Sequence, residues 1–323
     1  MKNPLPLACL VALSLSGLAQ PSLSSLSTVT ISLGNTPPSA LISSPFRHFE
    51  VIDERPDTAR IGIHTFFPTV GIPRDRQLVF HRPAATELAN YLNGHFARPD
   101  APYTALIILR NLWLSDAAYH RNEKEKDPGF HHERTYIRLK AEIYAVRDSL
   151  FIPVLRFDTL QAYKRDNPYT NISTYYTLWD RDLTGLLNHM TDSAARLTLS
   201  KKGPGRQIRL EDIRRYNQSR FDVPITGNTD LQPGVYASFN EFRENAPSIH
   251  DFEVRREKGN QLLYIRETGG SSWYSHDAWG YCDGKTIYIM RDGILYPIWK
   301  EGKAFYFYRQ AFKEIDMDSG EIY

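Results

Sequence analysis

Histidine and glutamate gather in one polar segment that could hold a metal ion. Residues 116–134 contain His120, His131, His132 and Glu133. Imidazole and carboxylate groups are ordinary ligands of transition metals. Two adjacent histidines on a loop rarely point at one ion, however, and no His-x-x-x-His spacing places two ligands on one helix face. We therefore expect a solvated loop, with no metal and no other cofactor.

A lone cysteine is the second chemical candidate. Cys282 could act as a nucleophile if His250 or His276 supplied the base, which would make the protein a Cys- or His-dependent hydrolase or transferase. The carboxylate of the adjacent Asp283 would raise the pKa of the thiol, which opposes this role. We favour a small buried residue before a tight turn, and we assign no catalytic residue.

Aromatic side chains are concentrated near the C-terminus. They are Trp273, Tyr274, Trp279, Tyr281, Tyr296 and Trp299. Exposed rings could stack on sugars or on a partner protein, whereas buried rings would fill the core of a small domain. We expect most of them to be buried and residues 269–273 to form an exposed loop. The candidate ligand or partner contacts are Trp273, Tyr274 and Trp279.

Charge and motifs narrow the classes of partner. The formal net charge is +2, so no global field gathers nucleic acid, and we expect no nucleic-acid partner. Residues 201–230 are basic and could touch anionic lipid or glycan, but a solvated connector is the simpler interpretation. The chain has no Gly-rich phosphate loop, no nucleophile-elbow serine and no paired carboxylates at a suggestive spacing.

The first residues have the pattern of an export signal. Lys2 precedes an apolar run, and Gly17-Leu18-Ala19 ends it with a small-x-small cleavage site. We predict a signal peptide at 1–19, export through the Sec route, and a periplasmic or secreted protein. Cys9 lies too early in the run to be a lipobox cysteine and leaves with the signal. The mature chain then has one cysteine, no disulfide and no transmembrane segment.

The first half of the chain predicts a mixed sheet with two helices on one face. Residues 20–47 form a Ser/Pro-rich leader, and residues 48–200 form the sheet-and-helix domain. Apolar spacing predicts helices at 82–96 and 173–200. The unbroken apolar run at 106–109 predicts a central strand buried on both faces.

Side-chain alternation predicts which residues share a face of each strand. After the central run, Leu109, Asn111 and Trp113 are expected on one face, and Arg110, Leu112 and Leu114 on the other. Residues 134–147 alternate most clearly. Their apolar side chains should face the core, and Lys140 should face solvent.

The second half predicts a small antiparallel domain. Residues 201–230 form the connector, in which Leu210, Ile213 and Tyr216 permit one short helix. Residues 231–323 form a β-meander with a short helix at 240–245. The strongest hairpin turns are Asp283-Gly284 and Asp292-Gly293. The predicted fold class is therefore α+β, in two domains.

Two stretches resemble known groups of proteins. Gly234-Val235-Tyr236, together with residues 279–284, resembles uncharacterised exported proteins of Bacteroidota-type bacteria, a resemblance that brings no activity. The layout from residue 49 through the run at 106–109 is similar to small envelope lipoproteins that assist assembly or transport, although this chain lacks their lipobox. That second resemblance implies an interaction domain.

Three hypotheses of function follow. The first is an exported, non-catalytic interaction or assembly module of the bacterial envelope, with another envelope protein as its partner. The second is a glycan-binding protein that uses the aromatic side chains of residues 231–323. The third is the hydrolase or transferase built around Cys282 or the histidine-rich loop.

Overall fold

The computed structural model describes residues 23–34, 44–66, 74–119, 132–165, 172–200, 207–227, 230–266, 272–309 and 311–322. The predicted signal peptide at 1–19 lies outside these ranges, as does part of the predicted leader. Within the leader, the structure describes η1 (Leu23–Ser25) and β1 (Ser27–Ile31).

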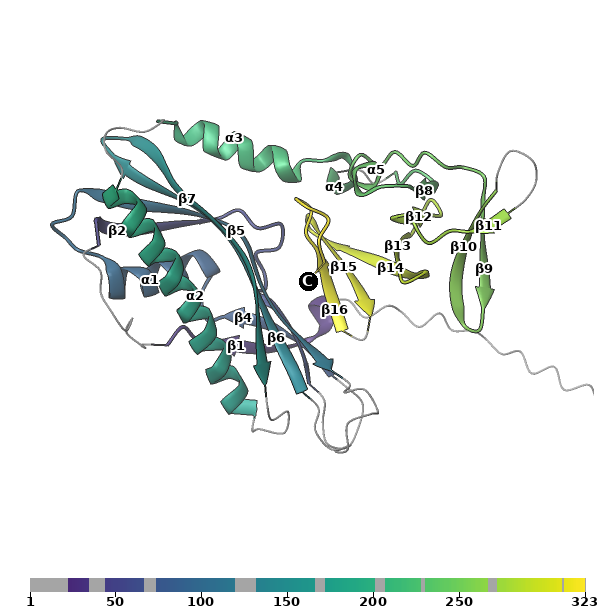
Figure 1. Cartoon of the computed structure of the whole chain (residues 1–323), viewed down its shortest axis with the longest axis horizontal. Helices are drawn as coiled ribbons and strands as arrows, with labels where there is room; N and C mark the ends of the chain where they lie inside the picture. The colour runs from purple at the N-terminus through teal and green to yellow at the C-terminus, as the bar shows by residue number, and fades with distance from the viewer. Residues whose placement is uncertain are drawn as a thin grey trace, which may run out of the picture.

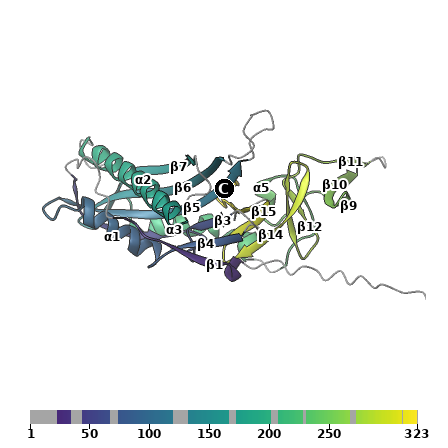
Figure 2. The ribbon, with the colours of Figure 1, turned by 90° about the horizontal axis from the view of Figure 1, so that it is seen from below.

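A mixed sheet forms the larger part of the molecule. Its strands after β1 are β2 (Phe46–Asp53), β3 (Gly62–Phe66), β4 (Arg74–Phe80), β5 (Tyr103–Tyr119), β6 (His132–Arg147) and β7 (Leu150–Arg165). The order is β1-β4-β3-β5-β6-β7, and β2 also pairs with β5. β5 runs parallel to β2 and β3 but antiparallel to β6. Figure 2 shows β7 as the outermost strand at one side.

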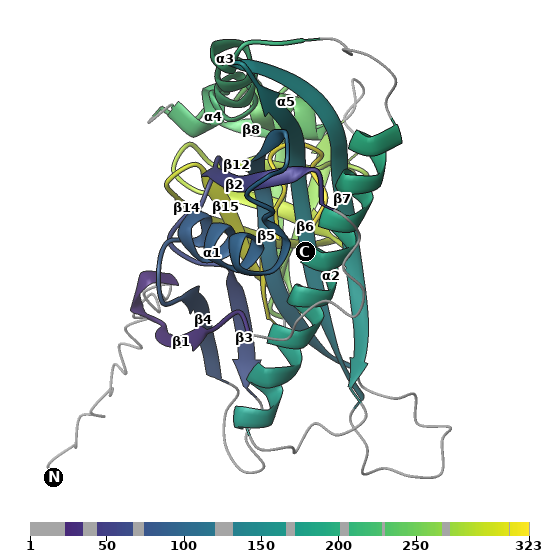
Figure 3. The ribbon, with the colours of Figure 1, turned by 90° about the vertical axis from the view of Figure 1, so that its left-hand side faces the viewer.

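Two helices cover one face of this sheet. α1 (Ala84–Phe96) and α2 (Ile172–Ser200) lie in front of the strands in Figure 3, and the C-terminal strands lie behind them. Leu88 and Leu92 of α1 and Leu183 of α2 join the buried cluster over β5 and β6. The predicted mixed sheet with two helices on one face is confirmed. Among the described helices, none combines the length and apolarity that a membrane crossing needs.

The apolar run at residues 106–109 of β5 is buried on both faces, as its composition predicts. Leu106, Ile107, Ile108 and Leu109 are each no more than 2 % exposed, because the sheet is covered on both faces. Ile107 and Leu109 face the helices. Leu106 and Ile108 face the other way and contact Ile213 of α3 (Leu210–Phe221).

The predicted alternation beyond Leu109 was wrong because the strand contains a β-bulge. The pairing of β5 with β6 shifts register between Leu109 and Asn111. An extra residue in one strand moves each later side chain to the opposite face. Leu112 and Leu114 therefore join Leu109 on the helix-covered face, while Trp113 packs against the C-terminal strands on the other.

The C-terminal residues form two antiparallel sheets. The three-stranded sheet has the order β11 (Ser272–Tyr274), β10 (Asn260–Arg266) and β9 (Phe252–Glu257). The six-stranded sheet contains β8 (Gly234–Tyr236), β12 (Gly280–Cys282), β13 (Ile287–Arg291), β14 (Ile294–Glu301), β15 (Ala304–Arg309) and β16 (Ala311–Ile315). Two short helices, α4 (Pro224–Gly227) and α5 (Phe239–Arg243), complete this part. The predicted α+β class, with an antiparallel C-terminal part, is confirmed.

The predicted turns and helix cap have the expected local chemistry. Asp292 and Gly293 both have positive φ, 47° and 76°, as a tight hairpin turn between β13 and β14 requires. The Ser238 hydroxyl caps α5 by accepting a hydrogen bond from the Glu241 N–H at 3.3 Å.

The second face of the large sheet is covered by α3 and the C-terminal strands, not by solvent. Figure 1 shows α3 spanning from the large sheet toward the C-terminal part, with β15 and β16 close to β6. Lys140 is only 5 % exposed and pairs with Asp316. The expectation that Lys140 faces water was therefore wrong. Its strand alternates as predicted, but an acidic partner covers its polar face.

Ion pairs and one ring contact join the large sheet to the C-terminal strands. The guanidinium of Arg60 lies 2.6 Å from Glu301, and the Tyr306 hydroxyl donates to Asp57 at 2.7 Å. Trp113 packs on Tyr306, with ring centroids 5.5 Å apart. A buried charge must be paired to be tolerated, so these contacts hold the two parts in one relative position.

One buried carboxyl in this interface has no cationic partner in direct contact among the residues that the structure describes. Glu314 is 5 % exposed, and burial, followed by the nearby charges of Asp316 and Asp57, raises its pKa to about 8. Arg55 and a hydrogen bond with Asn111 oppose this shift without cancelling it. Glu314 is therefore protonated in the fold at neutral pH.

We predict that Leu106→Asp and Lys140→Asp both destabilise the fold strongly. The first buries an unpaired carboxylate, which costs several kcal/mol. The second removes one member of a buried ion pair and sets two carboxylates together, a loss of about 3–5 kcal/mol or more. The exposed Lys285 is the matched control, where Lys285→Asp should cost about 0.5 kcal/mol or less. Urea unfolding measures all three, and similar midpoints for Lys140→Asp and Lys285→Asp would contradict the interface.

We predict that the free energy of unfolding contains a component from Glu314 that decreases as pH rises. The folded state holds this proton up to pH about 8, whereas the unfolded chain loses it near the ordinary glutamate pKa of about 4.3. The contribution is thus complete below the unfolded pKa and is lost through the folded pKa, with a slope of at most about 1.4 kcal/mol per pH unit. Urea titrations from pH 5 to 9 should show a flatter profile for Glu314→Gln. An unchanged profile would refute the assignment.

Candidate functional site

The histidine-rich segment is only partly described. His120 and His131 lie outside the described residues. His132 and Glu133 begin β6, where they pair in register with Tyr119 and Ala118 of β5. They belong to a strand, not to the predicted loop. Across the described ranges there is no group of three or more His, Cys, Asp or Glu side chains suited to hold a metal ion.

Cys282 lies at the end of β12 and is fully buried. Its sulfur accepts a hydrogen bond from the Gly284 N–H at 3.3 Å. Burial, which is the largest effect, raises the pKa of the thiol, and the Asp283 charge raises it further. His250 lies beside Gly234, the residue opposite Cys282 in the β8–β12 pair, yet neither His250 nor His276 is among the groups that shift this pKa. Burial and the raised pKa both favour the neutral thiol, which is the less nucleophilic form.

A buried histidine–carboxylate pair was not anticipated from the sequence. The Nδ1 of His64 on β3 pairs with Asp116 on β5, and Asp116 also accepts the Thr65 N–H at 3.0 Å. Trp179 of α2 packs on the imidazole, with ring centroids 5.7 Å apart. The His64 and Asp116 side chains are 5 % and 4 % exposed. A general base must reach its substrate, so this pair joins two strands under a helix rather than serving an open site.

The three aromatic candidates separate into core and surface positions. Trp279 is 9 % exposed and stacks on Phe242 with centroids 4.1 Å apart, inside the core of the six-stranded sheet. Trp273 is 43 % exposed, and Tyr274 is half-buried. The two neighbours point to opposite faces of β11, so the available contact residues are Trp273 and Tyr274, while Trp279 supports them from the core.

Tyr274 belongs to a row of stacked side chains on the three-stranded sheet. The Arg255 guanidinium lies 4.2 Å from the Tyr264 ring centroid, and Tyr264 and Tyr274 are 5.6 Å apart. We call Arg255, Tyr264 and Tyr274 the aromatic strip. Trp273 lies on the opposite face of the sheet, in register with Ile265. Tyr264 could have been found from the sequence, because it alternates with the apolar Leu263 and Ile265 in a predicted strand.

The side chains of the aromatic strip are held in place by a buried apolar cluster and by one hydrogen bond. On the other face of β10, Leu263 and Ile265 are buried in a cluster with Leu295 of β14. The Tyr274 hydroxyl donates to the Gly293 carbonyl at 2.5 Å, and a Cβ at position 293 would collide with that hydroxyl. Gly293 is thus needed both for the turn and for the approach of Tyr274.

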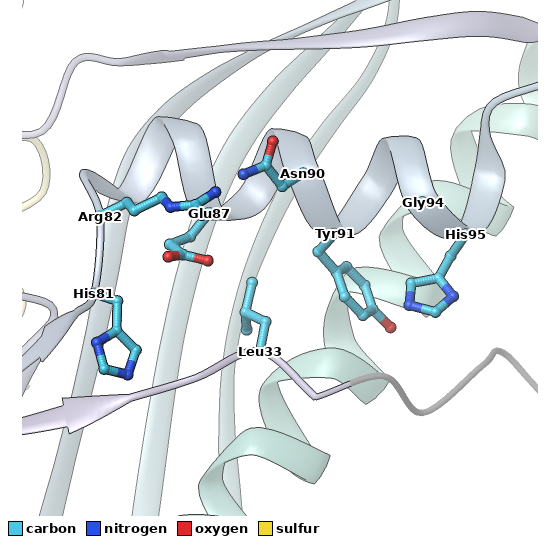
Figure 4. A pocket seen from close by; sticks show the side chains of 8 residues that line it. All are labelled: Leu33, His81, Arg82, Glu87, Asn90, Tyr91, Gly94 and His95. Carbon is cyan, nitrogen blue, oxygen red and sulfur yellow. The ribbon is translucent and has the colours of Figure 1, made fainter.

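A second candidate site is a polar hollow beside α1. Its volume is about 500 Å³, and it is lined by Leu33, His81, Arg82, Glu87, Asn90, Tyr91, Gly94 and His95. Figure 4 shows Glu87, Tyr91 and His95 of α1 directed toward the segment that follows β1, where Leu33 lies. The sequence analysis found no signal for this hollow, because its residues come from two segments separated by about fifty positions.

Comparison with known proteins identifies no family. No family model matches the chain, and no curated protein matches it either. Among solved structures, the chain is similar to a Xanthomonas campestris protein described by the family model DUF330. The identity is 14 %, the match covers 54 % of this chain and 97 % of that one, and the TM-score is 0.33. A likeness at that TM-score contributes nothing to the functional argument.

We predict that iodoacetamide labels Cys282 slowly in the folded protein. Burial removes access and the raised pKa lowers the thiolate fraction, so labelling at pH 7.5 should be at least ten times slower than for the same protein in guanidinium chloride. Mass spectrometry follows the single adduct. Equally fast labelling in both states would revive the nucleophile hypothesis.

Proposed function

We propose that the protein is an exported, non-catalytic interaction or assembly module of the bacterial envelope. The observation that carries this proposal is the aromatic strip of Arg255, Tyr264 and Tyr274, with Trp273 exposed on the opposite face of the same sheet. Trp, Tyr and Arg are the residue types that contribute most to binding at protein interfaces. The partner in this proposal is another envelope protein, and the export signal predicted at residues 1–19 supports that location.

The physical state of the strip favours recognition of a partner. Its side chains are ordered before binding by stacking, by the Tyr274–Gly293 hydrogen bond and by the Tyr264 hydroxyl, which donates to Glu257 at 2.8 Å. Ordering before association lowers the entropy lost when a complex forms. Among the described residues, the Cys282 thiol and the His64–Asp116 pair are both buried. These arrangements support binding over catalysis.

A glycan is the second candidate partner for the same surface. Flat rings stack on sugar faces, and carboxylates beside Tyr264 could accept hydrogen bonds from hydroxyl groups. Glu253 and Glu257 supply such carboxylates, and Glu253 pairs with Arg255 at 2.9 Å. The strip therefore offers the stacking and polar contacts that a glycan site uses.

Site-specific crosslinking tests the proposal. A photoreactive amino acid at position 273 of the full chain, expressed in its native cells, should give one saturable crosslink to an envelope protein. Trp273→Ala and Arg255→Ala in a chain crosslinked from position 264 should reduce that yield at least fivefold, because they remove anchor contacts. The expected species is identified by mass spectrometry.

Tyr308 provides the matched control. It is an aromatic residue of similar exposure, 40 %, on β15 of the other sheet, and crosslinking from position 308 should not give the same species. Equal yields from both positions would contradict a specific surface. Crosslinks to saccharide instead of protein would replace the leading proposal with the glycan alternative.

A further inference from the structure

The hollow beside α1 has walls that are fixed by the core. Leu33 packs against the main hydrophobic cluster, and the adjacent Gly34 N–H donates to Asp180 of α2. The Tyr91 hydroxyl donates to Asn188 at 2.7 Å, and the His95 ring lies 4.7 Å from the Tyr91 ring. The hollow is thus preformed by a helix and an anchored segment, the kind of support that holds binding groups in place.

The polar side chains of the hollow are left for another molecule. His81, Arg82, Glu87, Asn90 and His95 all line it. Within the described part of the chain, none of these five makes a recorded hydrogen bond or ion pair. Figure 4 shows Glu87 and His95 directed to the same side of α1, toward Leu33, whereas Asn90 does not point toward Leu33.

Gly94 is the second observation, and it is independent of the polar groups. It lies inside α1, where glycine costs about 1 kcal/mol relative to alanine. Its φ is not positive, and a Cβ at this position would meet nothing within 4 Å. No contact within the described structure requires a glycine here. Its effect is to keep the hollow open beside Tyr91 and His95.

The arrangement of charge selects the class of ligand. One guanidinium, Arg82, is balanced by one carboxylate, Glu87, and the amide of Asn90 both donates and accepts hydrogen bonds. Glu87 would repel a phosphate, and Arg82 would repel a cation. A neutral hydroxyl group satisfies such a set best, because each hydroxyl donates and accepts at once.

We propose that the hollow beside α1 binds a neutral saccharide of one or two rings. Its volume of about 500 Å³ lies within the range of small-molecule sites, and its lining offers both hydrogen-bond donors and acceptors, as a polyhydroxyl ligand requires. Tyr91 and Leu33 supply apolar surface beneath the sugar ring. This site is separate from the aromatic strip and does not depend on the proposed function.

Ligand-observed NMR on the purified full chain tests the proposal. The probes are glucose, N-acetylglucosamine, maltose and cellobiose, with inorganic phosphate and putrescine as anionic and cationic comparisons. At least one saccharide should show saturation transfer and raise the melting temperature in proportion to its concentration. Gly94→Leu fills the hollow and should weaken that binding at least tenfold.

A second helical glycine provides a closely matched control. Gly185 of α2 is exposed, and a Cβ there also meets nothing within 4 Å. Gly185→Leu should leave saccharide binding unchanged, and both leucine variants should melt no lower than the parent, because leucine favours helix. Glu87→Ala, which removes a hydrogen-bond acceptor, should weaken binding at least threefold.

Three results would contradict the proposal, each in a different respect. Binding of phosphate or putrescine without any saccharide would overturn the ligand class. Binding of no probe at 20 mM, roughly the weak end of small-ligand recognition, would overturn the site. Saccharide binding that survives Gly94→Leu but is lost with Tyr264→Ala would assign it to the aromatic strip instead.

Discussion

The main constraint on this fold comes from strand β6, which has one apolar face and one basic face. One face of β6 carries aliphatic side chains and lies under α1 and α2, while the other presents Arg138 and Lys140. Both basic residues are buried, at 6 % and 5 % exposure. A buried cation that loses its partner is far less favourable than one left in water. The second face can therefore be closed only by a surface that brings carboxylates to it.

That requirement explains why distant parts of the sequence must meet. Asp316 pairs with Lys140, Glu301 with Arg60, and Asp57 accepts the hydroxyl of Tyr306. These contacts join positions separated by 176 to 249 residues. They also establish where β14, β15 and β16 lie, and through the β10–β14 contact they determine where the three-stranded sheet presents its aromatic strip.

The two candidate sites illustrate different uses of glycine. Gly293 has φ of 76° and lies against the Tyr274 hydroxyl, so turn geometry and packing both require it. Gly94 has neither constraint and lines an open hollow. The hollow and its polar lining, not the glycine alone, support the proposed ligand, because Gly185 also lacks a packing reason. A sequence shows two glycines of the same kind, and only their surroundings distinguish them.

Periodicity in the sequence determined the local elements. It predicted helices at 82–96 and 173–200, which the structure places at 84–96 and 172–200, and it predicted the central strand with its run at 106–109, the alternation of β6 and the Asp-Gly hairpin turns. These features depend on neighbours within a few residues, which the sequence displays directly. The sequence did not determine the bulge after Leu109, the burial of Lys140, or the separation of Trp279 in the core from Trp273 at the surface. Each of these depends on which distant surface covers a face. A row of polar side chains on one face of a strand predicts exposure to solvent unless an oppositely charged surface packs against that face. Only the tertiary structure shows that Asp316 pairs with Lys140 in this way.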